Sequence, residues 1–517
     1  MSSNRNETRL NENKSEFTAR SVLSRASVEV ILGIAAFCFV LIGTSNQATA
    51  LPSFARQTGA PCGACHTDFP ALTPFGRQFK LGGYTMGGGK YRSTLFPQND
   101  PAKKTPGLGL PTKAPSDTSQ SNPYAPPISM MAIIGFTHTQ ADQDPTGSPY
   151  NANNNVVVAP VSLFYGGAIT DHIGAFAQLT YNNAPFGAQD PADPYTSKLW
   201  TWDNVDVRYA NTGSLGGMPV TYGITANNNP GVQDPWNSTP AWSFPYAVSS
   251  VAPTPSAGTL IDGTFAAHVG GAGAYAWINN LVYLELSGYR TLNHDAQAKL
   301  GADPFGAPGL FDGIAPYWRV AVEPNWGNHW LEVGAFGMSA RVHPWTLIPD
   351  ASGFYNSDTL PQTDRYNDIG FDSQYQYKGD NYWITLRGTY IHENQTLDAT
   401  FANFGSTNPT NTLNTFKAVA SLAYGNDNRI VVTGQYFNNW GTSDPLLYAG
   451  LASGFSPNSD GFIAEIAYIP FSSSNAPGWP WANARIGLQY TYYNKFDGTT
   501  INAHDNNSLF LYAWISM

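Results

Sequence analysis

Residues 364–392 read DRYNDIGFDSQYQYKGDNYWITLRGTYIH, and this stretch decides the fold. Polar and apolar side chains alternate on both sides of a short polar break at 379–380. Before the break, one face carries the apolar residues Ile369, Phe371, Tyr375 and Tyr377. The other face carries the polar residues Asp368, Asp372, Gln374 and Gln376. Successive side chains of a β-strand point to opposite faces. The pattern therefore predicts two strands joined by a tight hairpin, each with one apolar and one polar face.

The same alternation recurs along the chain after residue 127. We count sixteen candidate strands: 128–140, 154–168, 172–182, 198–209, 218–227, 263–276, 281–291, 315–324, 328–340, 364–378, 381–392, 414–424, 429–439, 459–469, 482–494 and 506–517. Most have the length of about ten residues that a tilted strand needs to cross a bilayer. A soluble β-sandwich would show the same alternation, so the connections have to distinguish the two folds.

The connections alternate between two sizes. Short ones lie near 169–171, 210–217, 277–280, 325–327, 379–380 and 425–428, with 470–481 as a longer exception. Long ones span 141–153, 183–197, 228–262, 292–314, 341–363, 393–413, 440–458 and 495–505. Outer-membrane barrels have short periplasmic turns and long external loops, whereas a sandwich has no reason to sort its loops. The sequence predicts an all-β, sixteen-stranded antiparallel outer-membrane barrel over residues 128–517, with both barrel ends in the periplasm.

Composition agrees with a membrane barrel. Charged residues make up 12% of the chain and aromatic residues 14%. Such low charge argues against disorder and against the surface of an ordinary soluble enzyme. The net charge is −10 and basic residues form no run, so we expect outer-membrane lipid as a partner and no nucleic acid.

Residues 1–50 are predicted to be a signal peptide. Five basic residues precede an apolar stretch over 30–43, and Ala48-Thr49-Ala50 follows as a small-residue cleavage site. An uncleaved anchor is the alternative. Cleavage after Ala50 would remove Cys38 and leave the mature chain with two cysteines, Cys62 and Cys65.

These two cysteines belong to the motif Cys62-Gly63-Ala64-Cys65-His66. Two thiols three residues apart, followed by histidine, form the attachment signature of c-type haem. Each thiol can form a thioether to the porphyrin, and His66 can then bind the iron as an axial ligand. A disulfide, a redox pair or half a zinc site are the alternatives. A redox pair needs a thioredoxin-like context and zinc needs further ligands at short spacing, and we find neither.

The flanking residues add a resemblance. The motif lies between PSFARQTG at 52–59 and FPALTPFGRQFK at 69–80, with Gly83-Tyr84 beyond. Residues 52–84 strongly resemble the N-terminal segment of the fused outer-membrane monohaem cytochrome–porins of iron-oxidising bacteria. The resemblance implies one covalent haem c joined to a barrel, and electron uptake from extracellular Fe(II). Read from the residues alone, basic and aromatic side chains here could contact haem propionates and porphyrin: Arg56, Arg77 and Lys80, and Phe54, Phe69, Phe75 and Phe79.

Four parts of the chain are thus predicted: the signal peptide at 1–50, a c-type haem domain at 51–86, a Gly/Pro-rich linker or plug at 87–127, and the barrel at 128–517. Met86 is a candidate second axial ligand, because neighbouring glycines would let the chain fold over the haem. The alternatives are His138, Met130, Met131, water, or a Met86 that is only a linker residue.

These parts together predict a function. We expect the haem domain on the periplasmic side or inside the barrel lumen. Carboxylates of the long loops should form an acidic external mouth that attracts cations: Asp142, Asp144, Asp190, Asp193, Asp234, Asp295, Asp303, Asp312, Asp350, Asp358, Glu393, Asp398, Asp444, Asp497 and Asp505. The chain would be an electron conduit, an oxidoreductase only in the electron-transfer sense, passing electrons from Fe(II) to a periplasmic cytochrome or other carrier. A haem-bearing solute porin and a cytochrome for another donor are the alternatives, and the oligomeric state is open.

Overall fold

A computed structural model describes residues 51–85, 127–144, 150–181, 200–302, 307–345, 348–349, 355–356, 359–425, 428–449 and 455–517. The expected signal peptide, Met86 and most of the expected linker lie outside the described residues.

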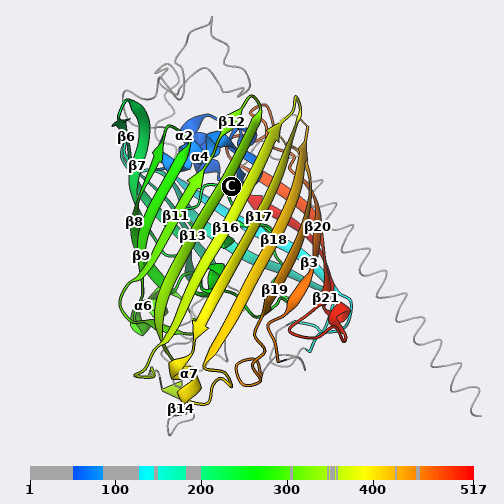
Figure 1. Ribbon diagram of the computed structural model, residues 1–517. Helices are drawn as coiled ribbons and strands as arrows, with labels where there is room; N and C mark the ends of the chain where they lie inside the picture. The colour runs from blue at the N-terminus through cyan, green and yellow to red at the C-terminus, as the bar shows by residue number, and fades with distance from the viewer. Residues whose placement is uncertain are drawn as a thin grey trace, which may run out of the picture. The chain divides into compact units, whose positions relative to one another are not determined.

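Sixteen long strands form one closed antiparallel barrel (Figure 1). They are β3 (Ile128–Thr139), β4 (Asn155–Ala168), β5 (Ile173–Tyr181), β6 (Trp200–Leu215), β7 (Met218–Asn227), β8 (Val269–Ile278), β9 (Val282–Thr291), β11 (Ala315–Val322), β13 (His329–Pro344), β16 (Asp364–Lys378), β17 (Tyr382–Thr396), β18 (Thr410–Tyr424), β19 (Ile430–Gly441), β20 (Ser459–Tyr468), β21 (Asn483–Lys495) and β22 (Ser508–Ser516). The last strand pairs with the first, with Leu511 opposite Phe136, and this pairing closes the ring. All sixteen predicted strands are confirmed.

Two strands, the sixth and the fourth, differ most from the prediction in their bounds. The sixth begins at Val269 instead of 263, because Leu260–Thr264 form a single helical turn, η2. The fourth continues to Leu215, so the predicted connection at 210–217 shrinks to Gly216 and Gly217. Both glycines have positive φ, as a tight two-residue hairpin turn requires.

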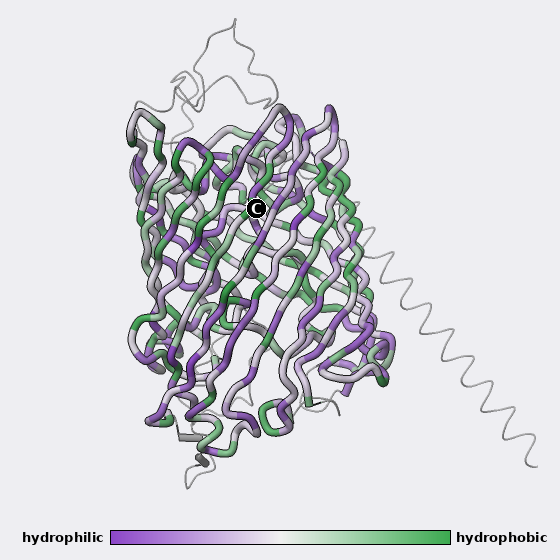
Figure 2. The backbone as a smooth tube through the Cα atoms, viewed as in Figure 1, coloured by the Kyte–Doolittle hydropathy of each residue, from purple (hydrophilic) through white to green (hydrophobic). Residues whose placement is uncertain are grey.

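The apolar face of each strand points outward. On β16, Ile369 is 48% exposed and Phe371 is 56% exposed, whereas Asp368, Asp372 and Gln376 are buried. Hydropathy accordingly alternates along the strands in Figure 2. An apolar exterior around a polar interior is the arrangement that lipid outside and polar groups inside require. No helix among the described residues is long and apolar enough to span a membrane.

The two ends of the barrel differ. The short connections and both barrel termini lie at one end, which we call the turn end; it is at the top of Figure 1, near β12 (Asn325–Trp326). The longer connections lie at the opposite end, the loop end. This end carries α6 (His294–Leu300), α7 (Asp398–Ala402), η3 (Ala503–Asn506), β10 (Gly309–Phe311), β14 (Ile348–Pro349) and β15 (Tyr355–Asn356).

The N-terminal segment lies inside the turn end. It comprises α2 (Pro52–Thr58), α3 (Cys62–Cys65), β1 (His66–Asp68), β2 (Ala71–Leu72) and α4 (Pro74–Leu81). Prolines begin α2 and α4, Gly59 ends α2 in a left-handed conformation, and the Thr73 side chain caps α4 by accepting from the Gly76 N–H. Buried ion pairs join the segment to the barrel wall, Arg77 with Glu323 and Asp68 with Arg485.

Residues 228–262 form a second structure in the lumen, which we call the lumen loop. The Trp236 indole donates to Glu323 on one wall at 2.5 Å. Across the lumen, the carbonyl oxygen of Ala247 accepts from Gln489 at 3.1 Å, and that of Pro253 accepts from Tyr493 at 3.0 Å. The prediction of an external loop is therefore wrong for this connection, because its aromatic side chains bury and its polar groups pair with the inward face of the strands.

Candidate haem site

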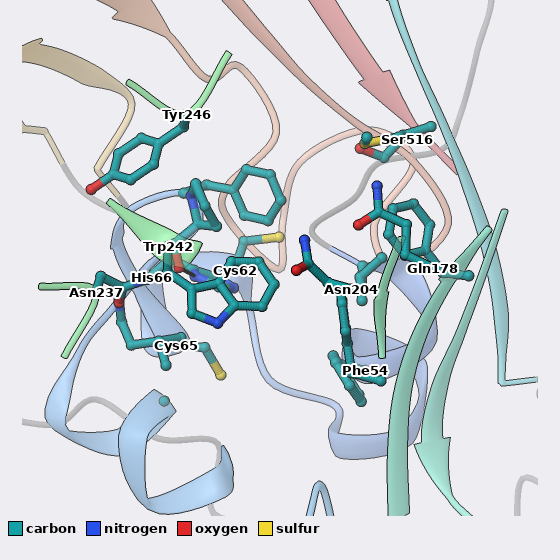
Figure 3. A pocket seen from close by; sticks show the side chains of 18 of the residues that line it. Phe54, Cys62, Cys65, His66, Gln178, Asn204, Asn237, Trp242, Tyr246 and Ser516 are labelled. Carbon is teal, nitrogen blue, oxygen red and sulfur yellow. Dashed lines mark hydrogen bonds between the residues drawn. The ribbon is translucent and has the colours of Figure 1, made fainter. Parts of the chain in front are cut away.

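A cavity of about 350 Å³ lies between the N-terminal segment, the lumen loop and the barrel wall (Figure 3). Its volume falls within the range of about 300–1,000 Å³ that ligand pockets occupy. Most of its lining is apolar, with aromatic rings from all three surrounding parts: Phe54, Phe69, Phe79, Phe164, Phe176, Trp242 and Trp514. Cys62, Cys65 and His66 all line it, so the structure brings the predicted attachment residues together at one cavity.

The two cysteines lie on the single turn α3. Residues three apart on a helix are neighbours on one face, so this turn sets both thiols toward the cavity. No disulfide joins Cys62 to Cys65 in the structure. The helix α4 packs closely behind them, since a Cβ added at Gly76 would collide with the carbonyl oxygen of Cys65. Gly76 is therefore required for this packing.

His66 follows the turn in an extended conformation. Its Nδ1 lies 3.0 Å from the carbonyl oxygen of Pro70, and its ring meets Phe69 edge-on at 5.0 Å. A backbone carbonyl at Nδ1 fixes the tautomer and leaves Nε2 for a metal, the usual support of a metal-binding histidine. Burial lowers the pKa of His66 to about 4, so the imidazole is neutral, which is its ligating form. These residues fit a c-type haem.

Of the three basic residues expected to contact haem propionates, only Lys80 lines the cavity. Arg56 donates to the carbonyl oxygen of Ile128 and stacks over Trp481, and Arg77 pairs with Glu323, so neither lines the cavity. Lys80 does line it, with its ammonium donating to the carbonyl oxygens of Val232 at 2.7 Å and Asp234 at 2.8 Å. Both arginines instead tie the N-terminal segment to its surroundings.

The sequence analysis missed three amide side chains that line the cavity: Gln178, Asn204 and Asn237 (Figure 3). Asn237 accepts from the Leu72 N–H at 3.0 Å, which joins the lumen loop to the N-terminal segment. These residues come from β5, β6 and the lumen loop, and no motif marks them. Of the four expected phenylalanines, Phe54, Phe69 and Phe79 line the cavity, whereas Phe75 is buried elsewhere.

Among the described candidates for the second axial ligand, only Met131 lines the cavity. Met86 lies outside the described residues, but Tyr84, two residues earlier, lines the cavity. Met131 also lines it. Met130 points to the opposite face of β3, 37% exposed, and His138 is exposed and hydrogen-bonded to Asn154. Neither Met130 nor His138 lines the cavity.

The external mouth is less acidic than expected. Four of the predicted carboxylates are buried and accept hydrogen bonds within the protein: Asp234, Glu393, Asp444 and Asp497. Asp142, Asp144, Asp295, Asp398 and Asp505 are exposed or nearly so, and Asp312 pairs with Arg341. The remaining five, Asp190, Asp193, Asp303, Asp350 and Asp358, lie outside the described residues. In the described part of the chain, no group of three or more His, Cys, Asp or Glu side chains could hold a metal ion.

No protein-family model matches the chain, and no curated protein matches it. Similar solved structures include Pseudomonas putida OprB at high pH, with a TM-score of 0.40 and 10% identity over 75% of this chain and 92% of that one. The outer membrane channel DcaP of Acinetobacter baumannii has a TM-score of 0.37 and 9% identity over 75% and 96%. OmpT, an outer membrane protein of Vibrio cholerae, has a TM-score of 0.37 and 8% identity over 75% and 95%.

Proposed function

We propose that this protein is an outer-membrane electron conduit. It carries one haem c bound covalently through Cys62 and Cys65, with His66 as an axial ligand. It takes electrons from extracellular Fe(II) and passes them to a soluble cytochrome or another electron carrier in the periplasm. The observation that carries the proposal is that both thiols and the imidazole face one apolar cavity inside a closed barrel.

The barrel supports the outer-membrane location. Its strands present apolar side chains outward and polar side chains inward, as a transmembrane barrel requires. Its short turns gather at the end that holds both barrel termini, which in this family of architectures is the periplasmic end. With this orientation, the candidate haem site faces the periplasm and the loop end faces the medium.

The side chains at the site have distinct tasks. The Cys62 and Cys65 thiols would attach the cofactor, and Nε2 of His66 would bind its iron while the Pro70 carbonyl holds the imidazole. The bound haem supplies a one-electron redox centre. The aromatic lining excludes water and sets the local polarity, which tunes the potential of such a centre. The Asn428 side chain, in a turn at the barrel rim, donates to the His66 carbonyl oxygen at 2.8 Å and so holds the motif at the turn end.

A haem-bearing solute porin is the second candidate function, because sixteen strands can enclose a water-filled channel. The described residues favour the conduit, since the lumen loop and the N-terminal segment both cross the space that a solute would use. Conductance of the purified protein in planar bilayers separates the two. Ohmic currents of porin size would support the porin.

Haem staining after denaturing electrophoresis tests the cofactor. The full chain, expressed with a cytochrome c maturation system, should give a haem-positive band, and the variant with Cys62→Ala and Cys65→Ala should not. Staining that survives in the double variant would refute covalent attachment.

Mixing the purified haem protein with Fe(II) tests the donor. Failure of Fe(II) to reduce the haem, while dithionite succeeds, would refute Fe(II) as the donor and leave a cytochrome for another donor or the haem-bearing porin.

A further inference from the structure

The candidate haem site and the loop end lie on opposite sides of the lumen loop. His66 is held by Asn428 at the turn end, while the lumen loop contacts the wall at Thr389 on one side and at Gln489 on the other. The external donor of the proposed function arrives at the loop end. Its electron therefore has to cross the lumen loop to reach the cavity.

A buried cluster of mostly aromatic side chains, completed by Val419 and Ile463, bridges this separation. We call Tyr246, Phe244, Phe437, Tyr493 and Phe496 the aromatic column. Tyr246 lines the haem cavity, and its ring lies 5.5 Å from that of Phe244. Phe244 is packed in one buried cluster with Phe437 and Tyr493. The rings of Phe437 and Tyr493 are 5.7 Å apart, and Tyr493 contacts Phe496 at 4.9 Å, in the connection that follows β21 at the loop end.

Specific contacts fix the column in place. Phe437 on β19 and Tyr493 on β21 both pair with Gly461 on the strand between them. Because a Cβ at Gly461 would stand 3.0 Å from the Phe437 ring, the glycine leaves room for the two rings to meet over it. The Tyr246 hydroxyl accepts from Arg387 at 2.8 Å, and the Tyr493 hydroxyl donates to Pro253 of the lumen loop. These hydrogen bonds hold Tyr246 and Tyr493 in place within the aromatic column.

We propose that the aromatic column is the electron route from the loop end to the haem cavity, with Phe496 at its outer end; this inference rests on the proposed function. Electronic coupling falls off more slowly through packed side chains than across a gap filled with water. One electron would leave an external ferrous ion, which becomes ferric, and would reduce the oxidised haem that Cys62, Cys65 and His66 would hold in the cavity. No proton moves, no bond breaks, and no residue of the column is itself oxidised.

A second aromatic cluster provides a matched control. Phe265 and Phe311 are buried with ring centroids 4.4 Å apart, in a cluster that also contains Tyr289, Tyr317 and Phe336. None of these residues lines the haem cavity. The two clusters have the same chemistry and burial, but only the aromatic column reaches the cavity.

The test compares two directions of electron delivery in outer-membrane vesicles that carry the haem-loaded protein. Fe(II) outside the vesicles delivers electrons at the loop end, and a membrane-permeant mediator with ascorbate delivers them at the turn end. Haem reduction is followed by absorbance. The variant with Phe244→Leu and Tyr493→Leu should slow reduction by Fe(II) several-fold and leave haem content and mediator-driven reduction unchanged. The variant with Phe265→Leu and Phe311→Leu should change neither.

Equal Fe(II) rates in the column variant and the unaltered protein would overturn the proposed route. So would slowing by both reductants, because that result would place the effect at the haem site. If Fe(II) fails to reduce even the unaltered protein, the proposed donor is wrong, and the impermeant reductant ferrocyanide then tests the column by the same comparison.

Discussion

Single side chains decide what the cavity can bind. One backbone contact, from Nδ1 of His66 to the Pro70 carbonyl at 3.0 Å, leaves only Nε2 for iron. A haem iron held by His66 would take a second ligand, and Tyr84, which lines the cavity, precedes the candidate Met86 by two positions in the sequence.

Replacing Met86 by Ala should remove the weak long-wavelength absorption of sulfur-ligated ferric haem and lower the redox potential, because a His/Met pair raises the potential. Met130→Ala is the control, since that side chain points away from the cavity. An unchanged spectrum in Met86→Ala would exclude Met86, and the same measurement on Met131→Ala would then follow.

The Arg77–Glu323 ion pair should hold the N-terminal segment in the lumen. Both side chains are buried, and Gln376 and Trp236 complete their hydrogen bonding. Removing one partner of a buried ion pair leaves an unpaired buried charge and costs about 3–5 kcal/mol of stability, whereas removing both partners costs less. Arg77→Leu should therefore release the segment to proteases more readily than the double variant Arg77→Leu, Glu323→Leu does. Equal release from the two variants would contradict a coupled pair.

At this scale the sequence predicted what is local. The motif at 62–66 has fixed spacing, so the sequence alone grouped Cys62, Cys65 and His66, and the structure places all three at one cavity. Arg77 was misassigned because its partner, Glu323, lies 246 positions away and no pattern joins them. Asn204 and Gln178 were missed for the same reason, since strand register alone brings them to the cavity.

At the scale of elements, strands were predictable and the lumen loop was not. A strand in a barrel must alternate in polarity, so each one carries its own signal. A long connection can fold outward or inward, and its length does not distinguish the two. The available signal was the density of aromatic residues over 236–246, where Trp236, Trp242, Phe244 and Tyr246 are too apolar for an exposed loop.

Orientation can be tested with two protease sites. One is inserted in α6 at the loop end, and the other between Gly216 and Gly217 at the turn end. Intact cells treated with the protease should be cut only at α6, because the turn end is expected in the periplasm. Lysed cells provide the control, in which both sites should be cut. Cleavage of intact cells at the glycine turn alone would reverse the topology.

Asp444 should make part of the loop end sensitive to acid. Burial alone would raise the pKa of Asp444, but the N–H groups of Leu447, Thr407, Asn411 and Asn408 lower it from its ordinary value of 3.8 to about 2. A depressed carboxyl pKa contributes stability that is fully present above the ordinary value and is lost as the pH falls through about 2. The protection of backbone amides over 404–411 and 442–449 against hydrogen exchange, taken relative to the intrinsic exchange rate at each pH, should therefore fall between pH 4 and pH 2.

Asp444→Asn is the matched variant for that measurement. An amide cannot accept every one of these hydrogen bonds, so the variant should exchange quickly at both pH values. Protection at pH 4 equal to that of the unaltered protein would show that the carboxylate does not order these connections.

For the whole molecule, the exposed carboxylates at the loop end should steer cations. Neutralising Asp142, Asp295, Asp398 and Asp505 to Asn should slow haem reduction by Fe(II) more at low than at high ionic strength, because salt screens exposed charges. Asp171→Asn, in a turn at the opposite end, is the control. Slowing by the same factor at both salt concentrations would mean that the loops do not steer.

The lumen loop also bears on how many copies a cell can carry. A sixteen-stranded barrel with an open lumen would admit small molecules. Every added copy would then let more toxins enter through the outer membrane and more metabolites escape. Here the chain fills its own interior, from Trp236 on one wall to Pro253 on the other. If the protein is the electron conduit proposed above, a cell would raise its respiratory current by adding copies of it to the surface while its sensitivity to antibiotics stayed the same.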